Sequence, residues 1–169
     1  IVYNKNKMTI TGGSVGEGAK TCIYSNDTLT LTGTTVDDCE KGIQIQNGTA
    51  NFDGIKVQNH ATSGIEFIQG TLKMFNSTVT NNGGAGLQIQ DEGVSLGQLA
   101  ICCGGTTIPG NNHIYNNTFF GVNTVTDEPG ESFIVLANGN TWNANKQGAN
   151  AQGKYGASAA VVDGPVGGV

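Results

Sequence analysis

Residues 71–93, TLKMFNSTVTNNGGAGLQIQDEG, constrain the fold most, because the segments before them are degenerate copies of the same pattern. TLTLTGTTVDDCEKGIQIQNG at 28–48 and TANFDGIKVQNHATSGIEFIQG at 49–70 align with it in steps of 21 and 22 residues. Self-similarity at this spacing is typical of a solenoid, in which each unit buries its apolar face only against its neighbours. The sequence therefore predicts a repeat protein.

Each repeat divides into three short pieces whose apolar residues recur in columns, and alternation of apolar and polar residues indicates strand. The first piece carries Met8 and Ile10, Leu29 and Leu31, Ala50 and Phe52, and Leu72 and Met74; the second carries Val15, Val36, Val57, Val79 and Ile114; the third carries Cys22 and Tyr24, Ile43 and Ile45, Ile65 and Phe67, and Leu87 and Ile89. These columns predict an all-β fold, a right-handed single-stranded parallel β-helix with three strands per turn and about six turns.

The predicted solenoid covers residues 1–143, with an insertion at 98–110 that interrupts the repeat. Residues 144–169 are rich in Gly and Ala and are expected to form a C-terminal cap and a tail or linker. Ile1–Tyr3 aligns with Cys22–Tyr24, so we expect the chain to be part of a longer solenoid. An open solenoid end is an unpaired edge, which makes head-to-tail self-assembly into filaments an alternative role.

The charge balance argues against two classes of partner. The net charge is −5 and every basic residue is Lys, so the chain lacks the guanidinium groups that bind phosphate best. The chain is therefore a poor candidate for binding nucleic acid or an anionic polysaccharide, and we expect no nucleic-acid partner. No apolar run reaches the roughly 18 residues that a membrane-spanning helix needs. His60 and His113 lack neighbouring Cys or His at ligand spacing, and we expect neither a metal nor a cofactor.

The chain has four cysteines, Cys22, Cys39, Cys102 and Cys103. Four cysteines permit three pairings, and an even number in a chain of this composition suits an oxidising compartment. Cys22 and Cys39 fall in successive repeats near one corner, which favours a bond between them. Cys102 and Cys103 could form a vicinal disulfide or pair elsewhere, and buried reduced thiols are the remaining alternative.

Two further columns mark the corners of the coil. Asn59, Asn81 and Asn116 share one column, which continues Glu17 and Asp38, and we expect a structural ladder of stacked Asn side chains there. The glycines at the start of the third piece are expected to supply a positive φ. These glycines are Gly42, Gly64, Gly86 and Gly121.

PGNNHIYNN at 109–117 and GNTWNANKQGANAQGKYG at 139–156, together with the repeats, resemble the C-terminal end of a bacterial family. This is a right-handed β-helix domain family of unknown function in the pectin-lyase-like superfamily. The resemblance covers approximately residues 8–155. It implies a secreted or cell-surface module of a larger protein, and it carries over no catalytic residues.

Superfamily relatives cleave uronate polymers, so the acidic residues need attention. Asp37 and Asp38 are an adjacent acidic pair in the repeats, and His60 lies one column and one turn further on. Successive strand residues face opposite sides, however, and no Arg is present to act as a lyase base. Enzymatic activity is therefore uncertain, and we interpret Asp37 and Asp38 as solvated turn residues.

Amide side chains on the outward face of the third piece suggest a carbohydrate-binding surface. Gln44, Glu66, Gln88 and Asn123 fall in one column, and Gln46 and Gln90 lie two residues further along. The alternative is that these residues only form the polar outer face that any β-helix needs. The prediction is a non-catalytic, extracellular structural or adhesive module whose partner is a glycan or a surface protein, with a polysaccharide-binding or polysaccharide-cleaving module as the alternative.

Overall fold

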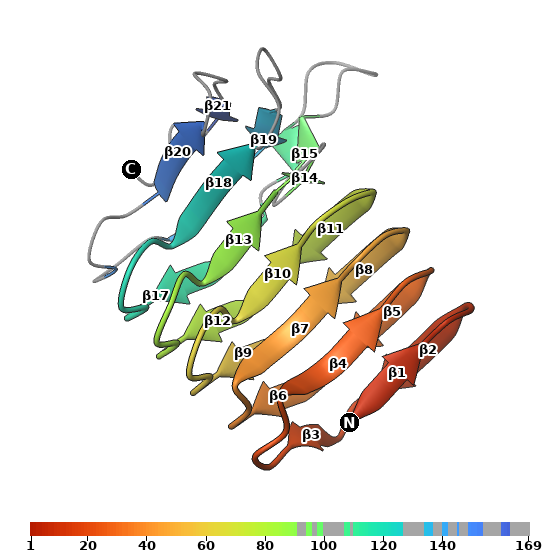
Figure 1. Ribbon diagram of the computed structural model, residues 1–169. Helices are drawn as coiled ribbons and strands as arrows, with labels where there is room; N and C mark the ends of the chain where they lie inside the picture. Colours follow the sequence, from red (N-terminus) through yellow and green to blue (C-terminus); the bar gives the residue numbers. More distant parts are fainter. Residues whose placement is uncertain are drawn as a thin grey trace.

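The computed structural model describes residues 1–90, 94–95, 98–99, 107–108, 110–126, 134–136, 140–141, 145, 149–153 and 160–162. These residues form an all-β parallel β-solenoid with three strands per turn and about four turns. Along the chain most strands go to three sheets in rotation, and each of these strands pairs with its counterpart one turn away. The strands of one sheet follow one another in chain order in Figure 1.

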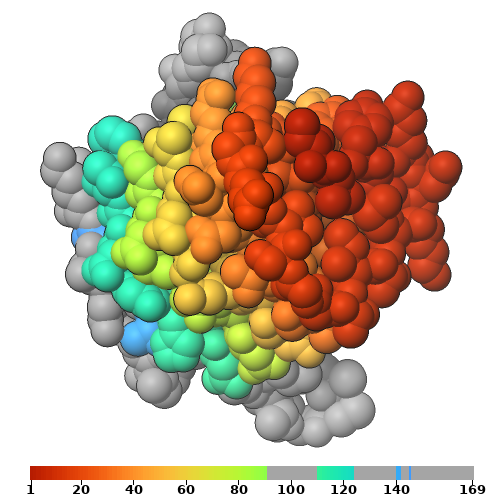
Figure 2. Space-filling view, turned by 90° about the horizontal axis from the view of Figure 1, so that it is seen from below, coloured from red at the N-terminus to blue at the C-terminus, as the bar shows by residue number. Residues whose placement is uncertain are grey.

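Sheet A contains β1 (Val2–Asn4), β4 (Thr21–Ser25), β7 (Lys41–Ile45), β10 (Ile65–Phe67), β13 (Leu87–Ile89), β18 (Val122–Thr126) and β20 (Ala149–Gly153). Sheet B contains β2 (Met8–Thr11), β5 (Leu29–Thr32), β8 (Thr49–Asp53), β11 (Thr71–Phe75), β14 (Val94–Ser95), β19 (Ile134–Leu136) and β21 (Ala160–Val162). Sheet C contains β3 (Ser14–Gly16), β6 (Thr35–Asp37), β9 (Lys56–Gln58), β12 (Thr78–Thr80) and β17 (His113–Tyr115). The space-filling view shows the same succession of turns from red to green (Figure 2).

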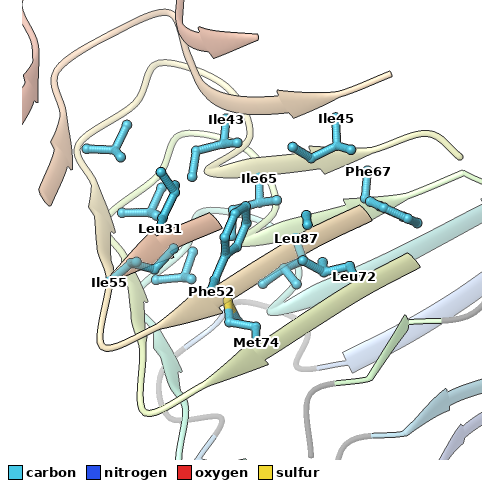
Figure 3. Close-up of a cluster of buried hydrophobic side chains, with 14 of the residues drawn as sticks. Leu31, Ile43, Ile45, Phe52, Ile55, Ile65, Phe67, Leu72, Met74 and Leu87 are labelled. Atoms are coloured by element: carbon cyan, nitrogen blue, oxygen red, sulfur yellow. The ribbon is translucent and has the colours of Figure 1, made fainter. Parts of the chain in front are cut away.

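The core consists of the inward columns that the repeat predicts. Leu31 pairs in register with Phe52, and Phe52 with Met74, so one column of sheet B runs through successive turns. Phe52 lies in the middle of the cluster, with Leu31 and Ile65 beside it (Figure 3). All these side chains are at most 2% exposed, and burying each stabilises the fold by about 1.5–3 kcal/mol.

One predicted column is wrong in the first complete turn. Tyr24 was expected to face inward in register with Ile45, but it pairs with Gln44, while Ile23 pairs with Ile43 and Ser25 with Ile45. The step in this strand is therefore one residue shorter than in the strands before it. Because side chains alternate between the faces of a strand, this shift moves Tyr24 to the outer face.

Several predicted features concern the C-terminal half. Within 98–110, β15 (Gln98–Leu99) and β16 (Thr107–Ile108) pair antiparallel, apart from the parallel ladders. Strands β20 and β21, inside the segment expected to be a cap and tail, pair with β18 and β19. Cys102 and Cys103 lie outside the described residues. No helix in the described segments is long and apolar enough to cross a membrane.

Candidate functional site

The corner between sheets C and A is made by residues in the left-handed conformation. Its φ values are 76° at Glu17, 53° at Asp38, 59° at Asn59, 57° at Asn81 and 56° at Asn116. Asn tolerates this conformation better than most residues, which explains its recurrence at this position. At this column Asn59 Nδ2 donates a 2.9 Å hydrogen bond to Asp37 Oδ1 of the preceding turn.

The buried hydrogen-bonded ladder of this corner lies one residue further along the chain than the predicted Asn column. It consists of His60, Asn82, Asn117 and Asn145, and each side chain accepts a backbone N–H from the preceding turn. Cys39 N donates to His60 Nδ1 at 3.1 Å, His60 N to Asn82 Oδ1 at 3.2 Å, Asn82 N to Asn117 Oδ1 at 3.2 Å and Asn117 N to Asn145 Oδ1 at 3.1 Å. The Asn-Asn pairs at 81–82 and 116–117 were the sequence signal for it.

The glycines at the start of the third strand of each turn make room for the side chains of this ladder. A Cβ on Gly42 would lie 2.6 Å from the His60 ring, and a Cβ on Gly64 would lie 2.7 Å from Asn82 Nδ2. The expectation of a positive φ at these glycines is wrong, since Gly42, Gly64 and Gly86 are not among the positive-φ glycines of the described residues. They are glycines because the ladder side chain and a backbone carbonyl of the next turn occupy the space beside their Cα atoms.

A disulfide occupies the same place one turn earlier. Cys22 stands in the glycine column and Cys39 in the ladder column, and their sulfurs are bonded, with a Cα–Cα distance of 5.8 Å. The prediction of a Cys22–Cys39 bond is confirmed. Both residues are at least 95% buried. The bond therefore fills the place that a glycine and an Asn side chain occupy in later turns.

The corner between sheets B and C has a second buried ladder. Ser77 Oγ accepts a hydrogen bond from Ile55 N at 3.2 Å, and Asn112 Oδ1 accepts one from Ser77 N at 3.0 Å. Asn140 Oδ1 continues the ladder by accepting from Asn112 N at 3.0 Å. Buried backbone groups without partners are costly, so these side chains satisfy amides that the turns leave unpaired.

His60 and Asp37, the candidate base and acid, form hydrogen bonds within this corner. His60 is buried and its Nδ1 accepts the Cys39 N–H, which leaves the proton of the neutral ring on Nε2. Burial lowers the pKa of His60, and this outweighs the opposing effects of the backbone of Cys39 and Val36 and of nearby carboxylates.

Asp37 is likewise held in place. Partial burial would raise its pKa, but hydrogen bonds from Gln58 and Asn59, at 2.8 and 2.9 Å, lower the pKa overall, with help from His60. Its neighbour Asp38 is exposed on the corner itself. Asp38 and His60 both line a hollow of about 700 Å³ at this corner, but the Nδ1 lone pair of His60 and the carboxylate of Asp37 are already engaged in hydrogen bonds, which leaves neither available as the acid or base of a reaction.

Cys22, Cys39 and His60 are the one group of possible metal ligands among the described residues, with ligand atoms within 4.8 Å of one another. The two sulfurs are bonded to each other and His60 Nδ1 is engaged by a backbone N–H. A thiolate and a free imidazole lone pair are what such a metal requires. In the disulfide form this group does not fit a metal site.

The predicted outward column does form a continuous row on sheet A. Gln44, Glu66, Gln88 and Asn123 pair in register, and Glu66 forms an ion pair with Lys41. The other predicted amides are not continuous, because Ile68 falls between Gln46 and Gln90; Ile68 N donates to Ile45 O and Gln90 N to Phe67 O.

Two tyrosines that the sequence reading missed extend this row. Tyr24 precedes Gln44 and Tyr3 precedes Tyr24, and their rings stack at 4.8 Å with an interplanar angle of 5°. Lys5 Nζ lies 5.4 Å from the centre of the Tyr3 ring, and Tyr3 is 55% exposed. Counting the third strand from Ile23 instead of Cys22 would have found both tyrosines.

No family model, no curated protein and no solved structure matches this chain. The structure supports the resemblance drawn from the sequence at the level of the parallel β-solenoid fold, and no comparison extends it to a family.

Proposed function

We propose that this chain is a non-catalytic extracellular or cell-surface β-solenoid module with a structural or adhesive role. The observation that carries the proposal is the use of its polar residues. His60 and Asp37, which a reaction would need as base and acid, are bound by backbone and amide groups of neighbouring turns. A rod stabilised in this way presents a fixed outer surface.

The disulfide supports the proposed location, because such bonds persist in oxidising compartments and are rare in the cytosol. It joins two turns through buried sulfurs. The finer description of the fold belongs to the same proposal: a right-handed coil of about six turns over residues 1–143, related to the pectin-lyase-like superfamily. Right-handedness follows the general rule for parallel crossovers.

The proposal is tested by incubating the purified chain with polygalacturonate and with neutral glucans. Reducing ends and the ultraviolet absorbance of unsaturated products are then measured. We expect no product above the level without protein. Product formation that disappears in an Asp37→Asn variant would overturn the non-catalytic role.

Peptide mapping after thiol labelling of protein from its native compartment should show Cys22 and Cys39 blocked until a reductant is added.

The row on sheet A favours a second candidate, a polysaccharide-binding module. The exposed Tyr3 and the half-buried Tyr24 beside the amides combine stacking surfaces with hydrogen-bonding groups, as sugar recognition requires. The row runs from Tyr3 through Gln44 and Glu66 to Asn123. A glycan array probed with the chain tests this candidate. Binding should disappear in a Gln44→Ala, Glu66→Ala, Gln88→Ala variant, and binding that survives the triple change excludes this face.

A further inference from the structure

A pocket of about 480 Å³ lies beside the outer face of sheet A, at the corner that follows sheet C. One wall is formed by the loops that follow β9, β12 and β17, and the other by Gln88 and Asn123 of sheet A. Its volume falls within the range of small-molecule sites. None of the residues lining it carries a charge, so the pocket suits a neutral ligand.

The loop wall of this pocket is built like a sheet. Gly84 N donates to Thr62 O at 2.9 Å, and Phe119 N donates to Gly84 O at 3.2 Å, so each loop is bonded to the next. A Cβ on Gly83 would lie 2.3 Å from Ala61 O, which shows how closely the loops stack. Gly83 and Gly84 contribute no side chains to this wall, so its middle loop does not fill the pocket. The pocket is therefore formed before a ligand arrives.

Two features point to what the pocket binds. Phe119 lines the pocket and is 50% exposed. Asn123 Oδ1 is buried and has no hydrogen-bond partner, whereas Gln88 Oε1 accepts a 3.4 Å hydrogen bond from Ser63 Oγ. A buried acceptor without a donor is costly, and a rotation of the Asn123 side chain that turns this oxygen toward the pocket would let a bound hydroxyl satisfy it.

A second hollow, on the outer face of sheet B, lacks such an unsatisfied group. It has a volume of about 430 Å³ and is lined in part by Asp53, Asn76 and Asn111. These side chains bond one another, from Asn76 Nδ2 to Asp53 Oδ1 at 2.8 Å and from Asn111 Nδ2 to Asn76 Oδ1 at 3.3 Å. The contrast favours the pocket beside Phe119 as a binding site.

We propose that the pocket beside Phe119 binds one pyranose unit of a neutral polysaccharide. The apolar C–H face of the sugar lies against the Phe119 ring, and one hydroxyl donates to Asn123 Oδ1. This inference rests on the second candidate function and narrows its ligand from sugars in general to uncharged ones. The rest of the polymer continues along the row of amides and tyrosines on sheet A.

The test uses the full chain and four probes: tetrasaccharides of β-1,4-linked glucose, mannose and xylose, and an oligogalacturonate as the acidic counterpart. Binding is measured by calorimetry and by the side-chain amide signals of Asn123 in NMR spectra. At least one neutral probe should bind and shift those signals. Phe119→Ala should weaken binding about tenfold, as expected for the loss of a stacking ring, and Phe119→Trp should retain it. Asn123→Ala should weaken binding about fivefold.

The control is Tyr115→Ala, which removes a half-buried aromatic ring from the outer face of sheet C and should leave affinity unchanged. Thermal unfolding of each variant establishes that it is folded. Binding that is lost in a Gln44→Ala, Glu66→Ala variant but unaffected by Phe119→Ala would leave the polysaccharide-binding function standing and overturn the pocket. Absence of binding to every neutral probe, or a preference for the oligogalacturonate, would also overturn it.

Discussion

The corner between sheets C and A is closed in two different ways along the same column. In the first complete turn Cys22 is bonded to Cys39 of the next turn. In later turns a glycine takes the place of Cys22 and an uncharged polar side chain takes the place of Cys39, as with Gly64 and Asn82. Strand pairing brings the same two positions together in both cases.

The comparison shows that one backbone geometry accommodates two chemistries with different requirements. The disulfide needs no hydrogen-bond donor or acceptor, but it exists only under oxidising conditions. The Asn ladder is independent of the redox state, but it requires a strand residue without a side chain, and each missing partner leaves a buried group unpaired. A chain that uses both is vulnerable at different places to reduction and to substitution.

The largest expected effect on stability comes from removing the Cys22–Cys39 disulfide. Cys22→Ala with Cys39→Ala should destabilise the fold by about 3 kcal/mol, since the bond closes a loop with a sequence separation of 17 residues. Cys22→Gly with Cys39→Asn installs the arrangement of the later turns and should recover about 1 kcal/mol of this loss. Denaturant unfolding of both double variants measures the difference. Equal stability of the two would show that the arrangements are not interchangeable.

A smaller loss should follow when a methyl group is placed in the glycine column. Gly42→Ala puts a Cβ 2.3 Å from the carbonyl oxygen of Gly64 and 2.6 Å from the His60 ring, and should cost about 2 to 3 kcal/mol. Gly18→Ala is the matched control, because its φ is +68° but a Cβ there would contact nothing within 4 Å. The control should cost about 1 kcal/mol, the price of the left-handed conformation alone. A larger loss at Gly18 would contradict the close approach.

The His60 position should make stability depend on pH. Burial lowers its pKa below the ordinary 6.5, so the unfolded chain takes up a proton that the folded chain does not. The free energy of unfolding should therefore fall as the pH decreases from about 7 to 5. His60→Asn, which copies Asn82, should remove this decrease. Asp37, whose pKa is lowered, contributes a further loss below the ordinary carboxylate value of 3.8 in both proteins.

The smallest effect is expected at the corner residue that precedes the ladder. Asp38→Gly in the disulfide-linked turn and Asn81→Gly in a later turn should each change stability by no more than about 0.5 kcal/mol. Both positions have positive φ, 53° and 57°, which glycine adopts without strain. Parallel denaturant titrations compare them. Unequal responses would show that the two versions of the corner also differ in backbone geometry.

The repeat in the sequence was sufficient to predict three strands per turn and the inward columns of sheets B and C, because stacking requires the same residue types at the same step. The disulfide followed from the same alignment. Tyr24 was misplaced because the first turn has one more residue between Glu17 and Thr21 than the next turn has between Asp38 and Lys41. An average period does not show which turn contains the extra residue.

The candidate site was predictable only where it coincided with a column. The amides from Gln44 to Asn123 share a register, so alignment found them. Phe119 and the unpaired oxygen of Asn123 depend on how loops project and pack, which no repeat pattern specifies. The glycine column was predicted for the wrong reason, a positive φ. A Cβ is excluded there by a side chain of the following turn.

The backbone N–H groups of the His60 ladder all donate in the same direction: the side chain of each turn accepts the N–H of the turn before it. A turn that has just left the ribosome therefore has a backbone N–H without a partner until the ladder side chain of the next turn is in place. We expect the nascent chain to fold from its amino end, one turn at a time, with each turn completed only when 21 to 35 more residues have been synthesised. The polarity of the ladder then sets the order of assembly during translation.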